Sequence, residues 1–245
     1  MADAALRAAC VTGVSRGLGV ALAAELLARG FEVTGIGRSA HASLAHPRFR
    51  FVAADLSRLE SLDALATEAF DAMAARGPAS AVLINNAATA APVGAVGSLA
   101  GDEIAAAFAA NLAAPAILAN AFVRSLSGRA PLRIVDVTSG SAARAMAGTA
   151  AYCAAKAGLE MWNAAAAAGA PPGIEFVVLR PGIIDTPMQE FVRTRSPEAL
   201  PEVALFRDFH ASGSLQSPEA TARRIVERVV LGEQGNGAVL RYQEL

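Results

Sequence analysis

Short apolar runs bounded by turn residues alternate with longer alanine-rich windows along the whole chain. Such runs are typical of buried strands, and the longer windows are typical of helices. The pattern predicts strands at residues 8–12, 31–35, 49–53, 81–85, 132–138, 174–179 and 238–242. It predicts helices at residues 18–29, 59–76, 102–126, 150–168 and 218–231. This alternation indicates repeated βαβ units, so the predicted fold is α/β: a doubly wound, seven-stranded parallel sheet with helices on both faces.

No linker or change of composition divides the 245 residues, so residues 1–245 are predicted to form a single domain. Residues 185–217 stand apart because they show no clear periodicity. A loop of that length in a compact domain is usually functional or disordered. It contains large apolar side chains, among them Met188, Phe191 and Phe206. We therefore expect this segment to form a lid over a substrate pocket.

Charge and composition exclude several classes of function. The formal net charge of -1 gives no reason to expect binding to nucleic acid or to an anionic membrane surface. No uninterrupted apolar run approaches the ~18 residues of a membrane span. The short segment before the first predicted strand leaves no room for a signal-peptide core, so no signal peptide is expected. The expected protein is soluble and cytoplasmic, with a small-molecule substrate. Cys10 and Cys153 are too few for a disulfide framework, and the three histidines lack metal-ligand spacing.

Lys156 is the only lysine in the chain, although lysine and arginine together number 21. An ammonium is a compact point charge, whereas a guanidinium is a planar fork with a higher pKa, so this position is expected to need the smaller cation. Tyr152 stands four residues earlier, inside the helix predicted at residues 150–168. Side chains four residues apart lie on one face of a helix. The two groups are therefore predicted to be neighbours.

A tyrosine beside a lysine can transfer protons. The phenol normally titrates near 10, and a cation about 4 to 6 Å away lowers that pKa by one to a few units. Tyr152 would then act as an acid or base near neutral pH. Ser139 follows the strand predicted at residues 132–138, where its hydroxyl could donate to a substrate oxygen. The alternative, from these residues alone, is a buried tyrosine and a lysine on a solvated helix surface.

A glycine-rich turn follows the first predicted strand, with Gly13, Gly17 and Gly19 in the pattern Gly-x-x-x-Gly-x-Gly. Glycines allow a tight turn and let backbone N–H groups approach a pyrophosphate at a helix N-terminus. The pattern alone is weak in a chain of 21 glycines. Its position between a strand and a helix gives it weight as a dinucleotide site.

The end of the second predicted strand carries Arg38 and no Asp or Glu. A cofactor without a 2′-phosphate would need an acidic residue there to bind its ribose hydroxyls. Arg38 and Arg16, from the glycine-rich turn, could instead bind a phosphate. The alternative is that both are ordinary surface arginines. We favour the phosphate, and hence NADP(H) over NAD(H).

Polar residues also follow the next strands. Asp55 could accept a hydrogen bond from an adenine amino group, with Leu56 packed beside the ring. Small residues around Asn86 would let the backbone pass beneath a flat cofactor. Asn111 lies within an apolar stretch, so it is either a core amide bonded to backbone or part of a polar relay toward Lys156.

Together these residues resemble the short-chain dehydrogenase/reductase family over nearly the whole chain. The motif residues are Thr12, Gly13, Gly17, Gly19, Asp55, Asn85, Asn86, Ala87, Asn111, Ser139, Tyr152, Lys156, Pro181 and Gly182. The resemblance implies a Rossmann-type NAD(P)-binding domain in which Ser139 positions a carbonyl and Tyr152 is the acid or base. It also implies that Lys156 binds the nicotinamide ribose and that Asn111 supports a water relay. The expected cofactor-binding residues are Gly13, Ser15, Arg16, Gly17, Leu18, Gly19, Arg38, Asp55, Leu56, Asn86, Tyr152, Lys156, Pro181, Ile184 and Thr186.

Short runs are similar to those of the bacterial benzil reductases and their sepiapterin reductase relatives, among them residues 15–19, 111–115, 185–189 and 237–245. Ala88 departs from the family, which usually has glycine there. The resemblance implies an NADPH-dependent carbonyl reductase acting on a ketone or diketone, assembled as a homodimer or homotetramer. Two alternatives stay open: an NAD-dependent alcohol dehydrogenase working oxidatively, and a non-catalytic NADP-sensing regulator. An epimerase or dehydratase is disfavoured because the length leaves little room for a C-terminal substrate domain.

Overall fold

The computed structural model describes residues 5–245 and contains one seven-stranded sheet. The strands are β1 (Arg7–Thr12), β2 (Glu32–Gly37), β3 (Phe49–Ala53), β4 (Ser80–Asn85), β5 (Leu132–Val137), β6 (Ile174–Arg180) and β7 (Ala238–Arg241). Their order across the sheet is β3-β2-β1-β4-β5-β6-β7, and every neighbouring pair is parallel. The doubly wound α/β fold predicted from the apolar pattern is confirmed.

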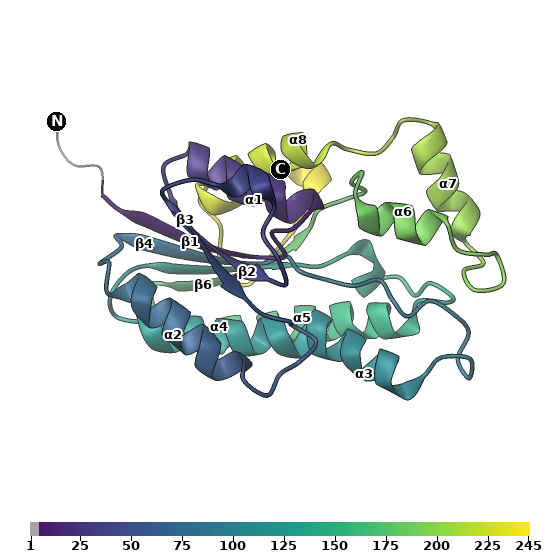
Figure 1. Cartoon of the computed structure of the whole chain (residues 1–245), viewed down its shortest axis with the longest axis horizontal. Coiled ribbons are helices and arrows are strands. Elements are labelled where there is room, and N and C mark those ends of the chain that lie inside the picture. The colour runs from purple at the N-terminus through teal and green to yellow at the C-terminus, as the bar shows by residue number, and fades with distance from the viewer. Residues whose placement is uncertain (1–4) are drawn as a thin grey trace.

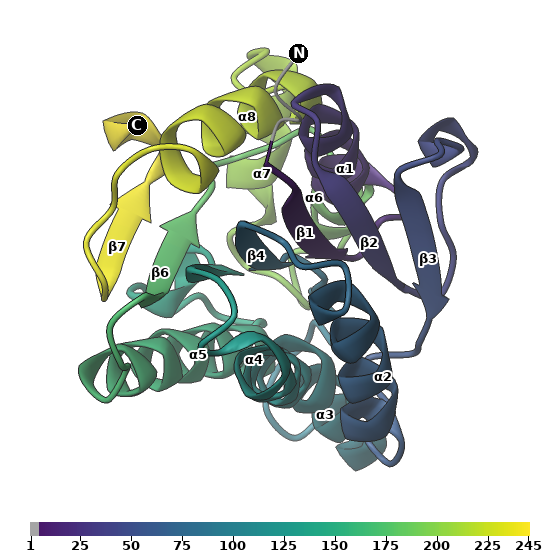
Figure 2. The ribbon, with the colours of Figure 1, turned by 90° about the vertical axis from the view of Figure 1, so that its left-hand side faces the viewer.

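Helices cover both faces of the sheet (Figures 1 and 2). One face carries α1 (Gly17–Ala28) and α8 (Pro218–Ile225), and the other carries α2 (Leu62–Ala74), α4 (Ala114–Leu126) and α5 (Ala150–Ala168). Because both faces are covered, strand residues of either parity are apolar, as in other parallel sheets. On β5, Ile134 belongs to the core on the side of α4, whereas Val135 and Val137 belong to the core on the side of α1 and α8.

The predicted helix at residues 102–126 is interrupted. The structure has α3 (Gly101–Phe108), a π-helical turn (Ala109–Ala113) and then α4. By length and composition, Gly101–Leu126 could cross a membrane. In this fold the apolar side chains of α4 pack in the core: Phe122 lies edge-on to Phe70 of α2, with ring centroids 5.1 Å apart. An apolar core helix is ordinary in an α/β domain.

Two helices form where the sequence shows no periodicity, so the expectation of an irregular loop at residues 185–217 is wrong in part. They are α6 (Pro187–Arg193) and α7 (Val203–Ala211), which extend past the carboxyl edge of the sheet (Figure 1). Thr186 caps α6 by accepting the Gln189 N–H, and proline occupies the first turn. Both helices are too short for a clear helical period.

The chain reverses its direction of winding between β1 and β4. These strands are neighbours in the sheet, although β2 and β3 separate them in sequence. The crossover after β1 and the crossover after β4 leave to opposite faces, which opens a crevice beyond the carboxyl ends of the two strands. The Thr12 hydroxyl accepts the N–H groups of Asn86 and Ala87 at 3.0 and 2.9 Å, so the two strand ends are tied together beneath that crevice.

Gly19 lets α1 approach the end of β1. A Cβ placed on Gly19 would lie 2.2 Å from the Gly13 carbonyl oxygen and 2.7 Å from Asn86 Nδ2. Gly13 itself has a φ of 78°, which favours glycine. The two glycines therefore set the close packing of helix, turn and strand at the crevice.

We expect Gly19→Ala to lower the free energy of unfolding by about 1–3 kcal/mol, because the backbone must shift to admit the methyl group. Gly101→Ala is the matched control. Gly101 begins α3 and has nothing within 4 Å of its added Cβ, so this change should be neutral or stabilise by about 0.5 kcal/mol. Urea denaturation of both variants measures the difference. Equal unfolding midpoints would show that the close approach at Gly19 is not needed.

Candidate active site

A cavity of about 770 Å³ lies at the carboxyl edge of the sheet, beside the crevice between β1 and β4. Cavities of this size hold small molecules and cofactors. The predicted residues that line it are Gly13, Ser15, Arg16, Leu18, Gly19, Arg38, Asp55, Leu56, Asn86, Ser139, Tyr152, Lys156, Pro181, Ile184 and Thr186. Gly17 and Asn111 lie just behind the wall. A Cβ on Gly17 would contact Thr186 Cγ2 at 3.2 Å.

Tyr152 and Lys156 are on successive turns of α5. Lys156 Nζ lies 5.9 Å from the centroid of the Tyr152 ring. The lysine is only 2% exposed, and its Nζ donates to the Val137 carbonyl at 2.8 Å, at the end of β5. The alternative of a lysine on a solvated surface is therefore wrong. A buried ammonium underlies this wall of the cavity.

The predicted net lowering of the pKa of Tyr152 is not found. Loss of water around the phenol raises the pKa of Tyr152 above its ordinary value, and the hydrogen bond of the Ser139 side chain opposes this only in part. The predicted direction of the net pKa shift is therefore wrong, because the loss of water penalises the phenolate more strongly than a nearby cation favours it. The phenol stays protonated through neutral pH and is therefore a proton donor.

Lys156 itself titrates at an unusual pH. Burial lowers its pKa to about 8, while the negative charges of Asp136 and Glu160 act in the opposite direction. Its ordinary pKa is 10.5. The group is thus an ammonium at neutral pH but loses its charge within a few pH units above that.

Ser139 stands two residues beyond the end of β5, where it caps the short 3₁₀ turn Gly140–Ala142. Its Oγ accepts the Ser141 N–H at 3.1 Å. This contact uses a lone pair and leaves the hydroxyl hydrogen to donate into the cavity. Ser139 and Tyr152 can therefore both donate to one oxygen atom placed between them.

Asn111 lies in the π-helical turn, and its side-chain amide forms two hydrogen bonds with the backbone of one residue. Its Oδ1 accepts the Thr89 N–H and its Nδ2 donates to the Thr89 carbonyl, both at 2.8 Å. The structure supports the first of the two sequence hypotheses, a core amide bonded to backbone. Asn111 fixes the loop around Thr89, which lines the cavity. A water relay from here to Lys156 stays a prediction.

The turn before α1 fits a diphosphate. The first N–H groups of a helix lack intrahelical partners, and no acidic residue lies in the first turn of α1. Gly13 and Gly19 present bare backbone, where a Cβ would meet neighbouring atoms at 3.0 Å or less. Arg16 and Arg38 line the cavity, are exposed, and form no hydrogen bond or ion pair within residues 5–245. Both guanidinium groups are thus available to an anion.

Asp55 offers an ionised acceptor at the same end of the cavity. Its Oδ1 accepts from the Ser57 hydroxyl at 2.7 Å and from the Ser57 N–H at 3.0 Å. These bonds lower the pKa of Asp55, and the charge of Arg38 lowers it further. The second carboxylate oxygen makes no hydrogen bond in the described part of the chain. The neighbouring Leu56 is buried and supplies an apolar surface.

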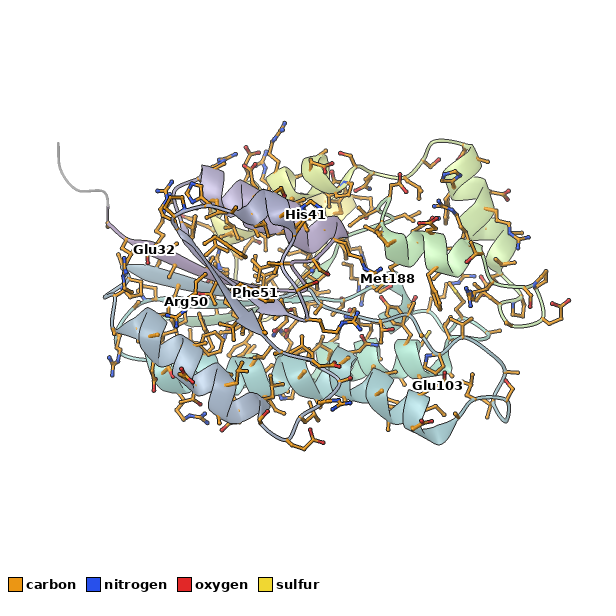
Figure 3. All side chains as sticks on the ribbon, viewed as in Figure 1. Glu32, His41, Arg50, Phe51, Glu103 and Met188 are labelled. Atoms are coloured by element: carbon orange, nitrogen blue, oxygen red, sulfur yellow. The ribbon has the colours of Figure 1, made fainter. Side chains whose placement is uncertain are left out.

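The opposite end of the cavity is mainly apolar. Its walls include Met146 and the side chains of α6 and α7, namely Met188, Phe191, Val192 and Phe206. Met188 of α6 and Glu103 of α3 line it from opposite layers (Figure 3). Sequence reasoning did not single out Glu103, because a carboxylate at the start of a surface helix has no distinctive pattern.

Sequence reasoning also missed a polar cluster behind the wall. Asp136 of β5 is fully buried, and it accepts from Asn85 Nδ2 and Asn163 Nδ2, each at 2.8 Å. Burial raises its pKa, and the two amides and the charge of Lys156 oppose that shift. A carboxylate inside the otherwise apolar run at residues 134–137 was the signal in the sequence that could have identified this cluster.

Comparison with known proteins agrees with this geometry. The family model described as short chain dehydrogenase matches residues 7–197. A benzil reductase ((S)-benzoin forming) of Bacillus subtilis is 29% identical over 240 residues, covering 96% of this chain and 97% of that protein. An NADPH-dependent pterin aldehyde reductase of Arabidopsis thaliana is 28% identical, covering 74% and 76%. The crystal structure of a short-chain dehydrogenase/reductase from Burkholderia vietnamiensis is 32% identical with a TM-score of 0.71, covering 80% of this chain and 94% of that one.

Because Lys156 is the only lysine, its titration can be followed directly. Protein labelled with ¹³C at the lysine Cε and carrying no lysine in any tag should give a single side-chain signal. We expect that signal to titrate with a midpoint near 8, since burial lowers the pKa of Lys156 to about 8. The same label in urea-unfolded protein is the control and should titrate near 10.4. A midpoint near 10.4 in the folded protein would contradict the buried ammonium.

Proposed function

The chain belongs to the short-chain dehydrogenase family, and on that premise we propose that it is an NADPH-dependent carbonyl reductase with Tyr152 as proton donor. As a member it is an NAD(P)-dependent oxidoreductase. The observation that carries the proposal is the convergence of Ser139 and Tyr152 on one cavity wall, with the buried ammonium of Lys156 beneath them.

In the proposed reaction a ketone oxygen lies between two hydroxyl donors. When bound, a reduced nicotinamide supplies the hydride that the ketone carbon accepts. Ser139 donates a hydrogen bond to the oxygen and fixes its position. Tyr152 gives its proton to the same oxygen, so the C=O becomes CH–OH and a phenolate remains. The positive charge of Lys156 stabilises that phenolate until a proton from solvent restores the phenol. The glycine turn, Arg16, Arg38, Asp55 and Lys156 would hold the cofactor.

The protonated state of Tyr152 supports the reductive direction. An alcohol dehydrogenase needs a phenolate that removes a proton from the alcohol. The pKa of Tyr152 is raised by burial, so the phenolate is scarce at neutral pH and the donor form predominates. Proton donation to a ketone oxygen needs that form.

The preference for NADPH over NADH rests on the end of β2. Arg38 directly follows that strand, and no carboxylate takes its place. Arg38 and Arg16 line the same end of the cavity and have no other partner in residues 5–245. Two free guanidinium groups are suited to a 2′-phosphate, which they can bind with two parallel hydrogen bonds each. The name of the pterin aldehyde reductase relative includes NADPH dependence.

The proposed substrate is an uncharged ketone or diketone with an aromatic group. The apolar walls formed by Met188, Phe191 and Phe206 suit aromatic rings, and α6 and α7 form the proposed lid over them. The similarity to a benzil reductase supports the same substrate class. A non-catalytic regulator would have no need of Ser139, Tyr152 and Lys156 on one wall. The cytoplasmic location, the single-domain organisation and the homodimer or homotetramer stay predictions.

Tyr152→Phe is expected to lower kcat for NADPH-dependent reduction of benzil by about 10²- to 10⁴-fold, because the positioned proton donor is removed. NADPH affinity, measured by fluorescence titration, should change little. Tyr242→Phe is the matched control: the only other tyrosine stacks on Arg224, outside the cavity, and its loss should leave kcat unchanged. Near-normal turnover by the Tyr152 variant would overturn the proposal. If wild-type protein binds NADPH yet reduces no ketone, diketone or pterin, the regulator hypothesis replaces it.

Arg38→Asp tests the cofactor preference separately. We expect the ratio of kcat/KM for NADPH to that for NADH to fall by about 10²-fold, since a charge-assisted phosphate contact worth about 1.5–3 kcal/mol becomes a repulsion. Arg58→Asp is the control, because Arg58 is also close enough to Asp55 to affect its pKa but does not line the cavity. A ratio that is the same in the Arg38 variant and in the wild type would show that Arg38 is not the phosphate ligand.

A further inference from the structure

A group of buried polar side chains lies between α5 and the sheet, behind the wall that carries Tyr152. Its centre is Asp136, which is 0% exposed. The surroundings are otherwise apolar and include Ile134 of the same strand and Leu118 of α4. Moving a carboxylate from water into such a place is costly unless charge and hydrogen bonds compensate. The cluster therefore needs an explanation beyond packing.

Hydrogen bonds compensate Asp136 only in part. Asn85 is its register partner on β4, and Asn163 comes from α5. Each amide donates one hydrogen bond to a different carboxylate oxygen at 2.8 Å. The Oδ1 atoms of both asparagines are buried and have no partner among the described residues. A cluster with two unsatisfied acceptors is a poor source of stability.

Lys156 lies immediately beside this cluster. Its Nζ donates to the carbonyl of Val137, the residue that follows Asp136 on β5. Asn163 is seven positions after Lys156 in α5, which places both on the face of the helix that meets the sheet. The buried ammonium and the buried carboxylate thus lie in the same layer between α5 and β5. Lys156 bonds to the strand residue next to Asp136, and Asn163, on the same face of α5 as Lys156, bonds to Asp136 itself.

The other charged groups around Lys156 are already paired. Glu160 of α5 forms a two-pronged ion pair with Arg180 of β6, at 2.9 and 2.6 Å, and also accepts from the Thr138 hydroxyl. Tyr152 is uncharged at neutral pH. Within residues 5–245, Asp136 is the neighbouring carboxylate of Lys156 that has no cation bonded to it. The amide donors on its two oxygens favour the charged form of Asp136, and that charge can act on Lys156.

We propose that Asp136 is a positioning residue, a buried negative charge that keeps the ammonium of Lys156 ionised beneath the active-site wall. Asp136 touches no reacting atom and acts only through Lys156. The arrangement gives a reason for a costly carboxylate in an apolar core: it maintains the charged state of a lysine that burial would otherwise neutralise. The catalytic meaning of that charge rests on the function proposed above, but the electrostatic pairing does not.

The local electrostatics agree with this assignment. Of the two charges that oppose the lowering of the pKa of Lys156, Asp136 acts more strongly than Glu160. Conversely, the charge of Lys156 helps to lower the pKa of Asp136 against the effect of burial. Each group therefore favours the charged form of the other, and the two titrate as a coupled pair.

The amides allow Asp136 to be replaced without leaving a gap. If Asn163 rotates its amide by 180°, its unpartnered Oδ1 can accept a hydrogen bond from a neutral group at position 136. This rotation gives up only a long contact from Nδ2 to the Val177 carbonyl, at 3.4 Å. Asp136→Asn is isosteric and can use that bond, so it removes the charge while keeping the hydrogen-bonded shape.

The test is the lysine titration by NMR in the protein without added cofactor, with ¹³C-labelled Lys156 as its single signal. Asp136→Asn should lower the titration midpoint by about one pH unit, the effect of losing an opposite charge nearby. The double variant Asp136→Asn/Asn163→Asp places the carboxylate on the other side of the hydrogen bond between these two residues. Its lysine titration midpoint should return toward the wild-type value. Asp63→Asn is the control, since Asp63 is an exposed carboxylate of α2 paired with Arg124, and it should leave the midpoint unchanged.

A folded Asp136→Asn variant whose lysine titrates as in the wild type would overturn the proposal. Should that variant fail to fold, Asn163→Ala provides the second test. It retains Asp136 but removes one hydrogen bond that favours the carboxylate, so the lysine titration midpoint should again fall. An unchanged midpoint in Asn163→Ala would also overturn the proposal.

Catalysis supplies a separate readout. In Asp136→Asn the alkaline limb of kcat/KM for NADPH-dependent benzil reduction should move to lower pH by the same amount as the lysine midpoint. A purely structural role would lower the rate at every pH without moving the limb. The NMR arm does not need turnover, so a protein that reduces no carbonyl compound would refute the proposed function and still test the pairing of Asp136 with Lys156.

Discussion

One buried ammonium determines how the rest of this site is built. Lys156 is held by the Val137 carbonyl at the end of β5, on the helix turn that follows Tyr152. A primary amine in such a place tends to lose its proton, and burial indeed lowers the pKa of Lys156 to about 8. The surroundings must therefore supply negative charge without exposing the group to water. The carboxylates of Asp136 on β5 and Glu160 on α5 supply this negative charge.

The fold brings these groups together because its strands are parallel. Carboxyl ends of parallel strands meet at one edge, so the ends of β1, β4 and β5 supply the glycine turn, Asn86 and Ser139 to a single cavity. Register does the same for the buried layer, since Asn85 and Asp136 are direct partners on β4 and β5. Residues far apart in sequence thus reach hydrogen-bonding distance with no adjustment other than strand pairing. The close approach at Gly19 then seats α1 against that edge.

The sequence predicted what depends on local pattern. All seven strands and the full length of α5 were identified, because their apolar runs are bounded by clear turn residues. The helices α6 and α7 were missed because they are too short to show a period. The direction of the pKa shift of Tyr152 was wrong, since the extent of burial is set by tertiary packing. The partners of Asp136 lie 51 and 27 residues away, beyond any local motif.

The pH dependence of stability separates a structural role of the buried pair from a functional one. Lys156 has a folded pKa of about 8 against an ordinary 10.5, so the folded state binds fewer protons between these values and is stabilised as pH rises through them. The pKa of Asp136 is raised from 3.8, so the folded state binds more protons above that value and loses stability as pH rises. Each group on its own therefore opposes folding when it is charged. A pair that costs stability at neutral pH therefore points to a role of the charged lysine at the cavity wall rather than in the stability of the fold.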